Sequence, residues 1–263
     1  MSTIRHASKI AVCHAALLAL LAPLPAAAGD AMAHGAMAGE NTAHEIRFTI
    51  RVENISTAQT LKLSNGMTAP APTAPIMWAI TDKGNPLFTA GTPDRGQGLE
   101  PLSEDGNPGV LADYFSRHPQ GIAHSGAVTI PVGDTAAGPI GPGHAFEFNV
   151  SAKPGQHLTM AMMFVQSNDL FYAPDSNAIA LFDDKGKALT GDITSQFKLW
   201  DAGTEVNEEP GLGPNQAHRQ AALNTGVEER GLVRLVHDEF VYPSNAQVMR
   251  VTIRPTTSGT AGK

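Results

Sequence analysis

The sequence has almost no cysteine. Its 263 residues include a single one, Cys13, which lies inside an apolar stretch near the N-terminus. Disulfides therefore cannot stabilise the rest of the chain, and a Cys-His catalytic pair is excluded from it. An exported protein of this composition must be held together by its apolar core or by a bound metal.

Aromatic side chains are also few, at 6% of the sequence with 2 Trp and 3 Tyr. Sugar-cleaving sites usually pair their carboxylates with aromatic platforms, so this scarcity argues against a glycosidase. The sequence also lacks G-x-S-x-G, H-E-x-x-H and a phosphate-binding glycine loop followed by lysine. We therefore expect a protein that is not an enzyme.

Long apolar runs are confined to the N-terminus. Arg5 and Lys9 precede an Ala- and Leu-rich run at 10–24, and small residues follow at 25–28. This order is typical of a cleavable secretory signal peptide over residues 1–28, and it predicts a secreted or periplasmic protein. No later segment approaches the roughly 20 apolar residues that a membrane span needs.

Positive charge is scarce too. The formal net charge is −7, and because residues 1–28 carry two cations and no acid, their removal makes it −9. An acidic exported chain is a poor partner for nucleic acid. We divide the remaining sequence into a flexible leader at 29–44, one domain at 45–255 and a flexible tail at 256–263.

Short strands separated by turns dominate the domain. Apolar residues alternate with polar ones at 46–53 and again at 146–150, and residues 158–165 form the most apolar run after the N-terminus. With 26 Gly and 19 Pro, the composition favours turns over long helices. The pattern predicts an all-β fold: an antiparallel β-sandwich with long loops and one or two short helical turns, at 110–117 and 192–197.

Three further local predictions follow from the residue pattern. Alternation at 128–132 predicts a strand. The prolines of 69–75 exclude a central strand there, and the turn residues of 82–109 predict loops throughout that range.

One acidic, glycine-rich segment stands out at 200–216, with the sequence Trp-Asp-Ala-Gly-Thr-Glu-Val-Asn-Glu-Glu-Pro-Gly-Leu-Gly-Pro-Asn-Gln. Hard cations such as Ca²⁺ take carboxylate and carbonyl oxygens from loops of this kind. Asp201 and Glu205 can point into one loop concavity, and Asp169 follows the most apolar strand, so it can reach the same end of a sandwich. The sequence therefore predicts a metal site at Asp169, Asp201 and Glu205.

Two other interpretations of the same segment stay open. It can be a solvated connection in a metal-free structural domain, where the carboxylates stay apart to avoid repulsion. It can also provide the paired carboxylates of a periplasmic carbohydrate-active enzyme or of its accessory domain.

The same residues carry a resemblance to a known family. The segments at 167–171 (Ser-Asn-Asp-Leu-Phe), 200–205 (Trp-Asp-Ala-Gly-Thr-Glu) and 210–216, together with 98–106, resemble bacterial spondin-domain proteins. These are relatives of the N-terminal spondin domain of F-spondin and mindin. The resemblance spans about residues 45 to 255.

The resemblance implies a β-sandwich similar to the C2 domain, with one calcium ion held by three acidic residues. These fall on Asp169, Asp201 and Glu205, the last of which stands where the animal domains have Asp. It also implies a non-enzymatic module for adhesion or ligand binding at the cell envelope, with a protein or glycan partner that the sequence does not name.

Overall fold

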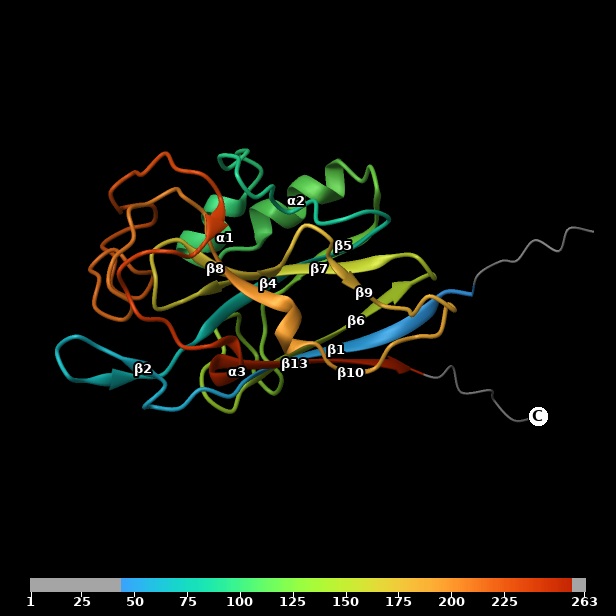
Figure 1. Cartoon of the computed structure of the whole chain (residues 1–263), viewed down its shortest axis with the longest axis horizontal. Coiled ribbons are helices and arrows are strands. Elements are labelled where there is room, and N and C mark those ends of the chain that lie inside the picture. Colours follow the sequence, from blue (N-terminus) through green and yellow to red (C-terminus); the bar gives the residue numbers. More distant parts are fainter. Residues whose placement is uncertain (1–43, 257–263) are drawn as a thin grey trace, which may run out of the picture. The chain divides into compact units, whose positions relative to one another are not determined.

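Two antiparallel sheets pack face to face in the computed structural model, which describes residues 44–256 (Figure 1). The strands of the first sheet, in their order across it, are β10 (Gly191–Asp192), β13 (Met249–Thr256), β1 (Ile46–Asn54) and β6 (Ala145–Ala152). The strands of the second sheet are β12 (Arg234–Leu235), β11 (Phe197–Asp201), β8 (Leu170–Pro174), β7 (His157–Phe164), β4 (Thr73–Thr81) and β5 (Ile122–Val128), with β9 (Ile179–Ala180) paired to β7. The predicted all-β sandwich is confirmed.

The main core lies between the two sheets. In β1, the side chains of Phe48, Ile50 and Val52 are fully buried while their neighbours are more exposed, as period-two alternation requires. Ile50 lies opposite Ile253 of β13 and Phe148 of β6. One register therefore places apolar side chains of all three strands on the inner face.

A second core explains why β7 reads as a continuous apolar run. Met160 and Met162 belong to the core between the sheets, whereas Ala161 belongs to a cluster on the opposite face. That outer cluster includes residues of two helices, α1 (Leu99–Asp105) and α2 (Gly109–Arg117), which cover this face of the second sheet (Figure 1). A strand buried on both faces does not alternate.

The remaining elements are short. They are a two-stranded sheet of β2 (Leu61–Lys62) and β3 (Thr68–Ala69), the single 3-10 turn η1 (Thr194–Gln196) and the helix α3 (Asn245–Val248). α3 begins with a capping box between Ser244 and Gln247. None of the helices among the described residues is long and apolar enough to cross a membrane.

The prediction of loops throughout 82–109 is wrong, because α1 forms there. Its proline, Pro101, lies in the first helical turn, where no intrahelical N–H donor is needed. Leu99 and Leu102 bury their side chains against the second sheet, and this burial outweighs the surrounding turn residues. The helical segment predicted at 110–117 is present as α2, and η1 lies within the one predicted at 192–197.

Two strand predictions also need correction. Residues 69–75 include the start of a central strand, because β4 begins at Thr73 and pairs with both β5 and β7. Pro75 of this strand lies where the register shifts between Thr73 and Ile76, so no ladder donor is lost there. Of the strand predicted at 128–132, only Val128 lies in a strand, where it is the last residue of β5. Beyond it, Ile130 and Val132 are 48% and 51% exposed, so their alternation faces solvent.

The signal peptide predicted at 1–28 lies outside the described residues. So do the leader at 29–44, except for its last residue, and the tail at 256–263, except for its first.

Candidate metal centre

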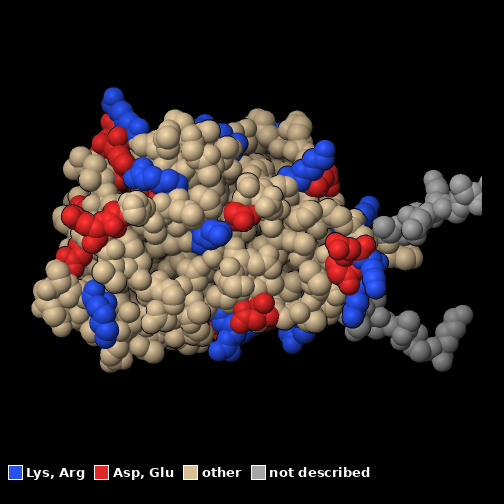
Figure 2. All heavy atoms as spheres, in the orientation of Figure 1, with Lys and Arg blue, Asp and Glu red and all other residues tan. Residues whose placement is uncertain are grey.

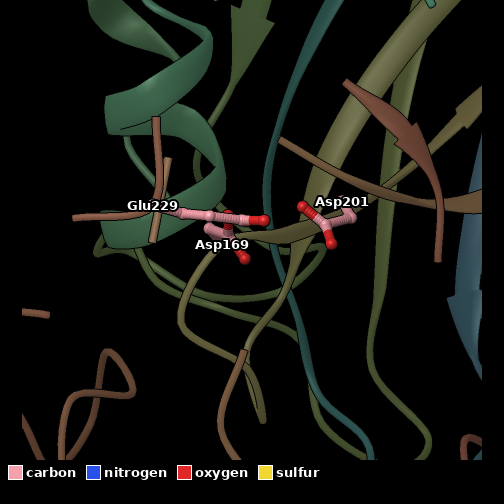
Figure 3. A group of neighbouring side chains, drawn as sticks. All are labelled: Asp169, Asp201 and Glu229. Carbon is pink, nitrogen blue, oxygen red and sulfur yellow. The ribbon is translucent and has the colours of Figure 1, made fainter. Parts of the chain in front are cut away.

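Three acidic side chains from separate segments converge at one end of the second sheet. Asp169 immediately precedes β8, and Asp201 is the last residue of β11. These two strands are antiparallel, with Asp201 opposite Leu170, so both aspartates lie at the same end of the second sheet. The third is Glu229, from the long loop before β12. One carboxylate oxygen from each lies within 4.8 Å of the others, and Figure 3 shows the three side chains directed toward one another.

A short irregular ladder brings Glu229 to this position. Thr204 accepts a hydrogen bond from the Glu229 N–H at 2.9 Å, and the Val206 N–H donates to Val227 at 2.8 Å. The chain thus leaves β11, travels more than 20 residues and returns antiparallel to its own start. The return places Glu229 beside the two aspartates.

Gly203 is the residue that permits this close return. Its φ is +70°, in the left-handed region, and a Cβ there would lie 2.7 Å from the backbone nitrogen of Leu232. The Gly203 N–H donates to Asp201 Oδ1 at 2.7 Å, and its carbonyl accepts from the Gly231 N–H at 2.7 Å. Only glycine fits both the backbone angle and the spacing.

The Asp169 carboxylate is fully buried and only half satisfied. Its Oδ2 accepts hydrogen bonds from the backbone N–H groups of Thr204 and Glu205, both at 3.1 Å, whereas its Oδ1 has no partner. Buried polar atoms are nearly always paired, and an unpaired one costs about 1–3 kcal/mol. The free oxygen belongs to one of the three clustered carboxylates, so a cation bound there would satisfy it.

Arg234 supplies the only positive side chain in ion-pair contact with this cluster among the described residues. Its Nη2 lies 2.7 Å from Asp201 Oδ2 and 2.8 Å from Glu229 Oε1, and its strand position is directly opposite Asp201. The guanidinium therefore offsets part of the charge of three carboxylates. One cation against three anions leaves room for a further positive charge.

The surroundings favour the protonated forms of the two aspartates. Burial first, and then the neighbouring Asp201, raise the pKa of Asp169 to about 7, although the N–H donors of Glu205 and Thr204 oppose the change. Burial also raises the pKa of Asp201, although the Arg234 guanidinium opposes this. A bound cation would favour the charged forms instead.

Glu205 does not join this group. Its Oε1 accepts a hydrogen bond from the Gly226 N–H at 2.7 Å, its Oε2 is buried without a partner, and its backbone N–H, not its carboxylate, contacts Asp169. The structure thus brings together two of the three residues predicted from the sequence, and Glu229 takes the third place. Glu229 follows another acid at 228 in an otherwise ordinary loop, so nothing in its local sequence marks it.

The chemistry of the donor set suits a hard cation. All three side chains present carboxylate oxygens, without histidine or cysteine, and nearby Asn207 has a buried Oδ1 with no partner while its Nδ2 donates to Asp201 at 2.8 Å. Ca²⁺ and Mg²⁺ bind such oxygen sets. The cluster can therefore hold a metal ion.

Charged side chains are visible on the surface at the same end of the molecule. Figure 2 shows Asp and Glu interspersed with Lys and Arg there, in the region where the long loop between β11 and β12 lies in Figure 1. On the face that Figure 2 shows, the charges at this end are of both signs.

Comparison with protein-family models finds none that matches this sequence, and no curated protein matches it either.

Proposed function

We propose that this protein is an exported, non-enzymatic, calcium-binding module of the spondin type, which serves adhesion or ligand binding at the cell envelope. One observation carries the proposal: three carboxylates from separate segments meet within 4.8 Å, and one of them, on fully buried Asp169, has an oxygen without any partner. Such an arrangement is stabilised by a cation.

Calcium fits this site better than magnesium. The ligands come from a sheet end and a long loop, and Ca²⁺ accepts the flexible geometry and six to eight oxygens that such segments provide, whereas Mg²⁺ demands a near-ideal octahedron. The signal peptide predicted at 1–28 supports export of the protein. The metal would link the returning loop to the sheet, so the loop surface would be ordered when calcium is bound.

The test is calcium titration of the chelator-treated protein by calorimetry, with thermal unfolding beside it. At 100 times its dissociation constant, calcium adds about 2.7 kcal/mol of stability, which raises Tm by roughly 5–10 °C for a domain of this size. We expect Asp201→Asn to abolish this rise. The matched control is Asp134→Asn, an exposed aspartate in a loop outside the site, which should leave it unchanged.

The same titration, applied to two further variants, identifies the third calcium ligand. Glu229→Gln should weaken calcium binding if the observed cluster is the site, whereas Glu205→Gln should do so if the family pattern holds. Absence of any calcium response in the native protein would refute the proposal. Cleavage of a glycan panel that is lost in Asp201→Asn would favour a carbohydrate-active enzyme instead.

A further inference from the structure

A second acidic site lies beside the metal cluster, on the side of helix α1. A cleft of about 580 Å³ is lined by residues of α1, of the loop before it, of 203–205 and of the returning loop. Its acidic members are Asp94, Glu100, Glu104, Glu205 and Glu228, and its single basic member, Arg230, is already held by Glu228 at 2.8 Å. Acidic side chains therefore outnumber basic ones in the lining of this cleft.

Two of these acids are buried and incompletely bonded. Glu104 and Glu205 are each only 2% exposed, and each has an Oε2 without a hydrogen-bond partner. Among residues 44–256, no Lys, Arg or His forms an ion pair with either carboxylate. Neither is needed for the cluster of Asp169, Asp201 and Glu229. Two buried carboxyl groups thus line one cleft, each with one oxygen that lacks a donor.

The dimensions and donors favour an organic cation over a bare ion. Ligand pockets typically measure about 300–1,000 Å³, and a cleft of about 580 Å³ would hold mostly water around a single metal ion. A guanidinium group has five N–H donors in one plane and pairs with carboxylates in a bidentate manner. Such a group can donate to more than one of the carboxyl groups that line the cleft.

We propose that the cleft between α1 and the loop segments at 203–205 and 224–231 binds a guanidinium group, with Glu104 and Glu205 as its two buried acceptors and Glu100 as a less buried acid of the lining. The ligand class is a small molecule or peptide that carries arginine. This site shares no side chain with the cluster of Asp169, Asp201 and Glu229, and the inference does not depend on calcium being the metal there.

The experiment is calorimetric titration with N-acetyl-arginine amide, with butylamine and N-acetyl-norleucine amide as comparison ligands. We expect saturable binding of the arginine derivative, at least tenfold tighter than that of butylamine, and no binding of the norleucine derivative. Glu104→Gln and Glu205→Gln should each weaken binding at least tenfold. Glu147→Gln, an exposed acid on β6, is the matched control and should have no effect.

Several results would overturn the proposal: no saturable binding, equal or tighter binding of butylamine, or binding unchanged in both buried-acid variants. If either variant fails to fold, as judged by circular dichroism, Glu100→Gln replaces it, and an undiminished affinity there counts against the site. Titrations with and without calcium keep the two sites distinguishable. Calcium binding that persists while arginine binding fails refutes only the guanidinium site, and the converse result refutes only the metal proposal.

Discussion

Arg234 is the residue whose side chain decides how the acidic cluster behaves without metal. One nitrogen of its guanidinium, Nη2, contacts both Asp201 at 2.7 Å and Glu229 at 2.8 Å. The Arg234 side chain is 37% exposed, so it can move away from the carboxylates. A calcium ion bound at the proposed site would compete with this guanidinium for the same carboxylate charge. Arg234 would then set the balance between a metal-free and a metal-bound cluster.

Replacing this arginine should shift that balance. In Arg234→Gln, the metal-free protein should lose about 1–2 kcal/mol of unfolding free energy because a charge-assisted contact disappears. Calcium affinity should rise about tenfold, since a competing positive charge is removed. Urea unfolding in chelator and calcium calorimetry measure the two effects. Lys198→Gln, an exposed lysine on β11, is the control; a fall in calcium affinity in Arg234→Gln would contradict the competition.

The buried carboxyls make stability depend on pH. Burial, with a smaller contribution from the charge of Glu205, raises the pKa of Glu104 from 4.5 to about 8. Burial likewise is the main cause that raises the pKa of Asp169 from 3.8 to about 7. The folded state therefore binds more protons than the unfolded state across this range, so the unfolding free energy falls as pH rises.

We expect the metal-free protein to lose several kcal/mol of unfolding free energy between pH 5 and pH 8, because two groups contribute and each pH unit between a group's unfolded and folded pKa costs up to about 1.36 kcal/mol. Glu104→Gln should flatten the part of the decline near pH 8. Chemical unfolding at a series of pH values, in the presence of chelator, checks both. A metal-free stability that increases over this range would show that the carboxyls are ionised and paired when folded.

At the scale of elements, the decisive piece is the loop that leaves β11 and returns as β12. Its first residues pair antiparallel with its last ones, and this pairing carries Glu229 to the aspartates and Gly226 to the Glu205 carboxylate. The loop thus folds back along its own first residues at the end of β11. Both proposed sites depend on its path.

Gly203 should be the most sensitive position of this loop. Gly203→Ala combines a left-handed backbone angle with a contact to the Leu232 backbone at 2.7 Å, so it should destabilise the fold by about 2–4 kcal/mol and weaken calcium binding. Gly133→Ala has a similar angle, with φ of +87°, but no atom near the added Cβ. It should lose only about 1 kcal/mol. Equal losses in urea unfolding would show that the close return is unimportant.

At the scale of the whole molecule, two cores share the second sheet. One lies between the sheets and the other beneath α1 and α2, so β7 is covered on both sides. No disulfide can contribute, because Cys13 is the only cysteine in the chain. Stability of the sandwich therefore depends on burial.

A truncation in the main core should show this dependence. Ile50→Ala removes a fully buried side chain that lies opposite residues of two neighbouring strands, and it should destabilise by about 2–5 kcal/mol. Ile130→Ala is the control, because that side chain is 48% exposed and should change stability by less than about 0.5 kcal/mol. Urea unfolding gives both values. A large loss in the control would place Ile130 in an unrecognised packing contact.

The sequence by itself determined the sandwich, because alternation at 46–53 and 146–150 and the apolar run of β7 are local patterns whose period dictates strand and face. It also singled out Asp169 and Asp201, each of which stands at a strand end beside a turn. Burial overrode the local signals at α1 and at the start of β4, where turn residues and prolines argued for loops.

Only the tertiary structure decided which third acid joins the aspartates. Glu205 is near Asp201 in sequence, yet the backbone turn at Gly203 directs its carboxylate to Gly226, and the returning loop delivers Glu229 from 28 positions beyond Asp201. Strand periods depend on neighbouring residues and can be predicted. The meeting of distant loop residues depends on the whole path of the chain, which no local pattern encodes.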